Sequence, residues 1–241
     1  MSDPHWDPDG EAERIERVYG RYRSSPSHVA RHASANPGNQ AIVAERDRTV
    51  DALLAEFGMA PLGGRRVLDV GCGFGHELAR MEALGARPAD MIGVDLVPER
   101  VDHARQAFPL IDFRVGNAAA LEFPDESFNV VLCYTLFSSI LDDETARRVA
   151  AGVERVLSPG GALAWFDIRY PNPANRNLRA VSRRTVRALF PTLTPHLRTV
   201  TLLPPLARRL GGLTPVAYPM LARVAVLRSH LAGLLVKGAR S

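Results

Sequence analysis

Residues 67–75 read VLDVGCGFG, a short apolar run that ends in three glycines at alternate positions. Such a run predicts a buried strand that enters a tight turn and then a helix. Glycine suits the turn because it reaches positive φ values and lets a ligand approach the backbone closely. In open α/β sheets, ligands bind beyond the carboxyl ends of the strands, where the strand order reverses. The turn is therefore expected to lie at a binding site.

The spacing of the glycines differs from that of a dinucleotide-binding turn. Gly71, Gly73 and Gly75 bring the third glycine one position earlier than G-x-G-x-x-G does. The carboxylate of Asp69 would meet the phosphates of a dinucleotide unfavourably, but it suits a cationic group such as the amino group of S-adenosylmethionine. Asp95 ends the next expected strand, and its carboxylate can accept hydrogen bonds from both ribose hydroxyls. A nicotinamide-dependent dehydrogenase is therefore the less favoured alternative.

Buried strand patterns alternate with helical patterns beyond Arg66. This alternation predicts an α/β fold, in which a mainly parallel sheet carries helices on both faces. Strands are expected at 67–70, 91–94, 111–115, 129–133, 162–168, 196–203 and 229–236. Helices are expected at 74–84, 98–108, 142–157 and 182–190, with a turn at 158–161.

The chain before this sheet is expected to form an N-terminal helical cap or lid over residues 1–60. Helical spacing covers 11–22 and 41–57, a loop with proline and glycine breakers joins them, and the first ten or so residues are expected to be disordered. Residues 61–241 are expected to form one domain, with an apolar, arginine-containing insertion at about 206–227.

The composition excludes several classes of protein. No run reaches the roughly 18 apolar residues of a membrane helix, and the polar, acidic N-terminus is not a signal peptide. Two cysteines cannot form a secreted disulfide framework. The histidines lack paired spacing with cysteine or carboxylate residues, so no metal site is expected. These features predict a soluble cytoplasmic protein.

The charges are unevenly distributed along the chain. The net charge is +4, yet no Asp or Glu follows Asp167, whereas thirteen Arg and Lys residues lie between Arg169 and Arg240. Such asymmetry favours an anionic substrate, partner or surface, with a merely compositional bias as the alternative. Nucleic acid is not expected as a partner, because the basic tract lacks interleaved aromatic residues.

Two interpretations of this basic third are open. Arg179, Arg183 and Arg187 are spaced to share one helical face, and with the 206–227 segment they would form an amphipathic surface. That surface would make peripheral contact with anionic membrane lipid or bind a phosphorylated, lipid-linked acceptor. The alternative is a buried insertion with its arginines on the solvated side.

The set formed by residues 67–75, Asp95, residues 116–118 (GNA) and residues 157–161 (LSPGG) resembles the class I S-adenosylmethionine-dependent methyltransferases. The resemblance implies a Rossmann-like, seven-stranded sheet with an antiparallel last strand, and S-adenosylmethionine as the cofactor. Asn117 stands where the family usually has an acidic residue that binds the adenine amino group, and its side-chain carbonyl can still accept that hydrogen bond. The implied cofactor-binding residues are Asp69, Gly71, Cys72, Gly73, Gly75, Asp95, Leu96, Asn117, Ala118, Cys133 and Tyr134.

Further stretches resemble a bacterial subgroup that modifies small molecules or glycans. They include residues 17–19 (RVY), 134–142 (YTLFSSILD) and 167–170 (DIRY). The resemblance implies methyl transfer to a small-molecule, natural-product, glycan or lipid-linked acceptor, with oxygen as the default atom because it is commonest among similar proteins. The alternatives are N- or C-methylation of a small metabolite, a nucleic-acid or protein acceptor, and a non-catalytic cofactor-binding relative.

Methyl transfer needs alignment of the nucleophile and the methyl group, and a hydroxyl nucleophile also benefits from a general base. Candidate catalytic residues are Asp167, Tyr134 and His32. Candidate substrate-binding residues are Tyr22, His28, Arg169 and Tyr170. Each has an ordinary structural alternative, such as an ion pair between Asp167 and Arg169 or a solvated loop.

Overall fold

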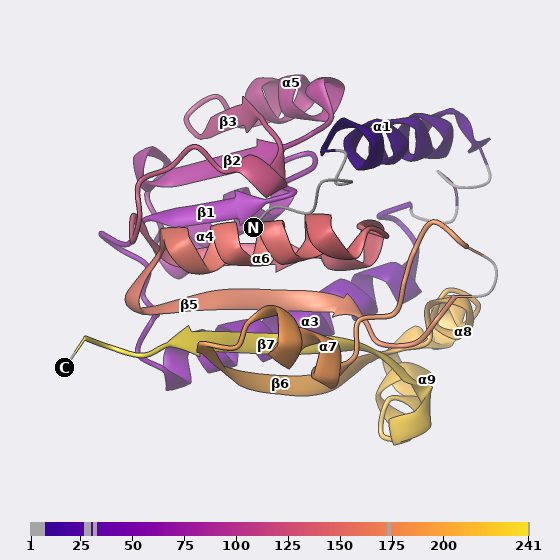
Figure 1. Ribbon diagram of the computed structural model, residues 1–241. Helices are drawn as coiled ribbons and strands as arrows, with labels where there is room; N and C mark the ends of the chain where they lie inside the picture. Colours follow the sequence, from indigo (N-terminus) through magenta and orange to yellow (C-terminus); the bar gives the residue numbers. More distant parts are fainter. Residues whose placement is uncertain (1–7, 27–29, 31–32, 173–174, 241) are drawn as a thin grey trace.

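The computed structural model describes residues 8–26, 30, 33–172 and 175–240 (Figure 1). Its centre is one seven-stranded sheet with the order β3-β2-β1-β4-β5-β7-β6. The strands are β1 (Val67–Val70), β2 (Met91–Asp95), β3 (Asp112–Val115), β4 (Phe128–Tyr134), β5 (Leu157–Ile168), β6 (Leu193–Leu202) and β7 (Arg228–Lys237).

The pairing of the strands confirms the predicted fold class. β1 to β5 pair in parallel, whereas β7 runs antiparallel to both β5 and β6. The chain runs outward from β1 through β2 to β3, then returns to β4 on the other side of β1. The strand order therefore reverses between β1 and β4, which is where an open sheet leaves room for a ligand.

Helices cover both faces of the sheet (Figure 1). One face buries apolar side chains of α3 (Pro37–Glu56), α4 (His76–Met81) and α5 (Pro98–Ala107). The other face buries side chains of α6 (Asp143–Val156) and α7 (Arg183–Leu189). Each face has its own continuous core, because strand residues alternate between the faces. The remaining long helix, α1 (Pro8–Ser24), lies over the edge where β1 and β2 end.

The start of α3 differs from the prediction. Pro37 and Gly38 had been interpreted as loop breakers, yet the helix begins at Pro37 rather than at residue 41. Asn36 caps it, accepting hydrogen bonds from the N–H groups of Gly38 and Asn39, and proline is well tolerated at the first helical position. A Cβ on Gly38 would lie 2.2 Å from the carbonyl oxygen of Ala207, so glycine is what lets α3 approach the 206–227 segment.

Three smaller predictions differ from the structure. Residues 158–161 belong to the start of β5, with only Gly160 in the left-handed region (φ 72°). Arg179 lies before α7 and pairs with Asp143, so it does not share a helical face with Arg183 and Arg187. The first ten residues had been expected to be disordered, yet residues 8–10 belong to α1, and residues 1–7 lie outside the described part of the chain.

The segment after β6 forms short helices at the edge where β5 ends (Figure 1). They are α8 (Pro204–Ala207), a 3-10 turn (Gly211–Leu213), α9 (Thr214–Leu221) and a second 3-10 turn (Ala225–Leu227). A small cluster that includes Leu202, Ala207 and Tyr218 anchors this segment. Among the described residues, no helix combines the length and the apolar character needed to cross a bilayer.

Candidate active site

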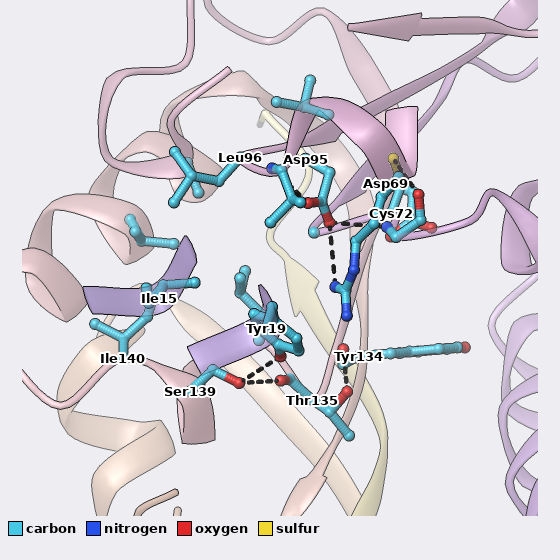
Figure 2. A pocket seen from close by; sticks show the side chains of 18 of the residues that line it. Ile15, Tyr19, Asp69, Cys72, Asp95, Leu96, Tyr134, Thr135, Ser139 and Ile140 are labelled. Carbon is cyan, nitrogen blue, oxygen red and sulfur yellow. Dashed lines mark hydrogen bonds and ion pairs between the residues drawn. The ribbon is translucent and has the colours of Figure 1, made fainter. Parts of the chain in front are cut away.

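A cavity of about 310 Å³ opens at the carboxyl ends of β1, β2 and β4, at the reversal of strand order (Figure 2). Residues that directly follow or end these strands form its floor. Helices α1, α3, α4, α5 and α6, together with the turns that follow β3 and β4, contribute the rest of its wall. The lining residues on the floor are Gly71, Cys72, Gly73, Asp95, Leu96, Tyr134 and Thr135.

The glycine turn after β1 has the conformation that its sequence predicts. Gly71, Gly73 and Gly75 have φ values of 81°, 53° and 82°, which disfavour any side chain. The N–H groups of Gly71 and Cys72 donate to the carbonyl of Val94 (2.7 and 3.0 Å), which ties the turn to β2. Gly71 and Gly73 line the cavity, whereas Gly75 does not, because it lies behind them at the start of α4.

Asp95 connects the glycine turn to the end of β2. Its Oδ2 accepts the N–H of Gly73 and its Oδ1 accepts the N–H of Val97, both at 2.9 Å. Arg100 lies 4.0 Å away. Each carboxylate oxygen has a further lone pair, so the group can still accept hydrogen bonds from two hydroxyls in the cavity. The geometry therefore suits a vicinal diol such as that of a ribose.

Asn117 and Ala118 line the cavity beside Leu96. The side-chain carbonyl of Asn117 accepts the N–H of Ala119 (2.9 Å) and so caps the short turn that follows β3. One lone pair of this oxygen is therefore used within the protein, and the second lone pair and the amide N–H groups are what a ligand can meet.

Asp69 brings a buried carboxyl group to the cavity. It is 2% exposed and lines the cavity, and within the described part of the chain its carboxylate accepts no hydrogen bond. Burial raises the pKa of Asp69 well above its usual range, and Glu77 and Asp95 raise it further, while Arg46 opposes them. An uncompensated buried carboxylate is costly, so this wall is complementary to a cationic group.

Helix α1 closes the other side of the cavity. Glu11 accepts the N–H of Leu141 (2.6 Å), and the hydroxyl of Tyr19 lies 3.0 Å from the hydroxyl of Ser139, beyond β4. The guanidinium of Arg100 stacks 3.9 Å from the centre of the Tyr19 ring. Because these contacts come from a loop and a helix on the far side of the opening, α1 covers part of the cavity.

The two residues at the end of β4 point to opposite faces of the sheet. Cys133 is buried in the core beneath α6 and does not line the cavity. Tyr134 lines it, but its ring points away from Ile15 and Tyr19, toward α3 (Figure 2). There Arg46 stacks 4.8 Å from the ring centre, and the hydroxyl has no hydrogen-bond partner among the residues that the structure describes. The Tyr134 hydroxyl is therefore not placed for proton transfer.

Tyr134→Phe is accordingly expected to leave ligand binding and turnover within about twofold of the unmodified chain. Because it removes a buried hydroxyl without a partner, it is expected to raise the free energy of unfolding by about 1 kcal/mol. Urea unfolding and initial rates check this, with Tyr134→Leu as the control that also removes the ring under Arg46. A tenfold loss of turnover in Tyr134→Phe would contradict this placement of the hydroxyl.

Several predicted site residues lie outside the cavity. Asp167 is buried, and its oxygens accept the N–H groups of Ser138 (2.9 Å) and Ile168 (2.8 Å), so it orders the loop after β4. Burial raises the pKa of Asp167 to about 6.

The candidate substrate-binding residues that the structure describes also lie outside the cavity. Arg169 stacks on Tyr170, 4.3 Å from the ring centre, and Tyr22 hydrogen-bonds Asn175 (3.0 Å). His28 and His32 lie outside the described residues.

The structure adds charged residues that the sequence reasoning missed. Arg46 is buried in α3 and pairs with Glu77 at 2.6 Å, and both line the cavity. Within the described ranges of the chain, the second oxygen of Glu77 has no hydrogen-bond partner. Glu77 lies two residues after the glycine turn, in the first turn of α4. Its closeness to the turn in the sequence is the signal that could have indicated it. Arg46 is distant in sequence, and no local pattern indicates it.

Comparison with known proteins agrees with this geometry. Residues 67–161 match a family model described as a methyltransferase domain. A probable phthiotriol/phenolphthiotriol dimycocerosates methyltransferase of Mycobacterium ulcerans is 40% identical over 119 residues, which cover 46% of this chain and 42% of the relative. The corresponding protein of Mycobacterium leprae is 34% identical over 143 residues, which cover 53% and 49%. The chain therefore matches about half the length of these relatives or less.

Solved structures of low sequence identity share the fold. An S-adenosylmethionine-dependent methyltransferase from Mesorhizobium loti superposes with a TM-score of 0.57 at 20% identity, covering 78% of this chain and 96% of the other. The [4+2]-cyclase SpnF superposes with a TM-score of 0.57 at 19% identity, covering 79% and 80%. Because one fold hosts several reactions, the activity is argued from the site. Residues 67–161 form a methyltransferase domain, and the chain has the fold of the class I S-adenosylmethionine-dependent methyltransferases.

Proposed function

We propose that this chain transfers a methyl group from S-adenosylmethionine to a hydroxyl of a small or lipid-type acceptor. The observation that carries the proposal is the buried Asp69 carboxylate, which faces the cavity beside the glycine turn without a hydrogen-bond partner among the described residues. A cationic amino group would compensate this charge, whereas a diphosphate would be repelled by it.

Residues at the ends of the first three strands would hold the cofactor. The glycine turn and Asp69 would receive its amino-acid end, Asp95 its ribose, and Leu96, Asn117 and Ala118 its adenine. When bound, S-adenosylmethionine supplies a methyl group on a sulfonium, whose departure leaves a neutral thioether. The protein then has to align the acceptor and exclude water, and α1 would contribute to that exclusion because it covers part of the cavity.

The nature of the acceptor is supported by the relatives and by the charge of the chain. The mycobacterial relatives are named as methyltransferases of phthiotriol and phenolphthiotriol dimycocerosates. The strongly basic residues 169–240 favour an acceptor that is anionic or lies at an anionic surface. Oxygen is the atom we propose, in preference to nitrogen or carbon.

Transfer of a labelled methyl group tests this function. The chain is incubated with S-adenosylmethionine labelled in its methyl group and with long-chain triols, or with the matching amines. We expect label in the triols and release of S-adenosylhomocysteine, and neither with Asp95→Ala. Label in the amines alone would mean that nitrogen, and not oxygen, is the methylated atom. Tight cofactor binding without transfer to any acceptor would favour a non-catalytic role.

The raised pKa of Asp69 predicts how cofactor binding depends on pH. Only the ionised carboxylate attracts the amino group, so affinity is expected to fall as the pH decreases through the raised pKa of Asp69, nearer neutrality than for an ordinary aspartate. Asp69→Asn is expected to weaken binding by about 1.4 to 3 kcal/mol at pH 8 and to flatten this dependence. Calorimetric titrations between pH 5 and pH 8 measure both. An unchanged pH profile in Asp69→Asn would contradict the role of Asp69.

A further inference from the structure

The surface of the segment from residue 205 to residue 226 is almost wholly apolar. Twelve of its residues are exposed, and only two of them, Arg209 and Arg223, are polar. The others are Pro205, Gly212, Leu213, Pro215, Val216, Pro219, Met220, Val224, Ala225 and Val226. Exposed apolar residues are normal when scattered, but a contiguous patch marks an interaction site.

The apolar side chains are concentrated on one side of α9. Leu213, which caps the start of α9, and Val216 and Met220 within it follow a spacing of three and four residues, so the three side chains share one side of the helix. They are 69%, 68% and 64% exposed, and Val226 just beyond the helix is 68% exposed. The opposite side is held to the protein by Tyr218, whose hydroxyl donates to Glu45 (2.7 Å). The exposed face is therefore presented by a firmly anchored helix.

The charges within this patch are free. Among the described residues, neither Arg209 nor Arg223 has an acidic partner within ion-pair distance, whereas Arg46 and Arg80 are both paired. From residue 168 to the end of the chain there is no Asp or Glu that could neutralise them. Two unpaired cations in an aliphatic surface are complementary to a partner that is apolar inside and anionic outside.

We propose that this α9 surface, residues 205–226, binds the surface of an anionic phospholipid bilayer. Leu213, Val216, Met220 and Val226 would enter the interface, while Arg209 and Arg223 meet the lipid phosphates. A second copy of the same surface would bring like charges together. Nucleic acid would find no exposed aromatic residue on which a base can stack, since Tyr218 is 4% exposed.

The position of the surface fits a membrane-associated acceptor. Helices α8 and α9 lie at the edge of the sheet where β5 ends, and the cavity opens at the ends of the neighbouring parallel strands (Figure 1). Binding to lipid does not require methyl transfer, so the proposal stands independently of the proposed function and can be measured without cofactor.

Flotation with phosphatidylglycerol vesicles and with phosphatidylcholine vesicles tests the proposal. We expect the chain to float with the anionic vesicles at low salt. Leu213→Ser with Val216→Ser and Met220→Ser is expected to reduce the partition coefficient at least about tenfold. Arg209→Ala with Arg223→Ala is expected to reduce it about fivefold for each charge removed, and less at high salt.

Matched controls separate this surface from general effects. Leu110→Ser removes a leucine that is 78% exposed near β3. Arg87→Ala with Arg147→Ala removes two exposed charges elsewhere. Both controls are expected to float like the unmodified chain, and near-identical melting temperatures show that the variants fold. The proposal is overturned if the unmodified chain does not float, if the controls lose binding equally, or if the triple serine variant instead abolishes a dimer detected by light scattering.

Discussion

Asp95→Ala is expected to lower the affinity for S-adenosylmethionine by at least about 100-fold. The carboxylate is placed to accept hydrogen bonds from two ribose hydroxyls, and charged hydrogen bonds of this kind each contribute about 1.5 to 3 kcal/mol. It also accepts the N–H groups of Gly73 and Val97, so its removal releases the glycine turn from the end of β2. Isothermal titration with S-adenosylmethionine measures the loss.

Asp112→Ala provides the control for this variant. Asp112 begins the neighbouring strand β3, is exposed, and pairs with Arg114 at 2.6 Å outside the cavity. Its loss is expected to change affinity by less than about twofold, because exposed ion pairs contribute little. If Asp95→Ala bound the nucleoside within threefold of the unmodified chain, Asp95 would have no part in the site.

Gly75→Ala is expected to reduce the free energy of unfolding by about 2 to 4 kcal/mol, against about 1 kcal/mol for Gly73→Ala. Both residues have positive φ, which costs a side chain about 1 kcal/mol. A Cβ on Gly75 would also lie 2.6 Å from the buried ring of Phe113, and overpacking of this kind costs roughly 1 to 3 kcal/mol more. A Cβ on Gly73 would meet no atom of the described residues within 4 Å.

The two glycine variants should therefore separate stability from binding. Gly73 lines the cavity, so its alanine variant is expected to remain folded and to bind S-adenosylhomocysteine more weakly. Urea unfolding followed by circular dichroism measures the stabilities, and titration of the folded variants measures the affinities. Equal loss of stability in both variants would mean that contact with Phe113 is not what requires glycine at residue 75.

The sheet and the glycine turn could be predicted because their causes are local. The apolar run of β1, the glycines with positive φ and the aspartate at the end of β2 each follow from neighbouring residues. The start of α3 was also encoded locally, since Asn36 followed by Pro37 is a helix-start signal. Alternation along β4 likewise implies that only one of Cys133 and Tyr134 can face the cavity.

Other parts of the site depend on contacts between distant segments. Arg46 reaches Glu77 and Tyr134 only because α3 packs on the same face of the sheet as α4. Asp167 is buried because the loop after β4 folds back so that the N–H of Ser138 donates to its carboxylate. No sequence pattern predicts the path of that loop. Glu11 and Tyr19 enter the site because α1 crosses the opening. Such residues become visible only once the tertiary structure is known.

Calorimetric titration of the purified chain with S-adenosylmethionine, S-adenosylhomocysteine and NAD⁺ addresses the central claim directly. The account predicts that both sulfur nucleosides bind at a single site with micromolar dissociation constants and that NAD⁺ gives no heat of binding. A correctly folded chain that bound neither sulfur nucleoside, or that preferred NAD⁺, would contradict it.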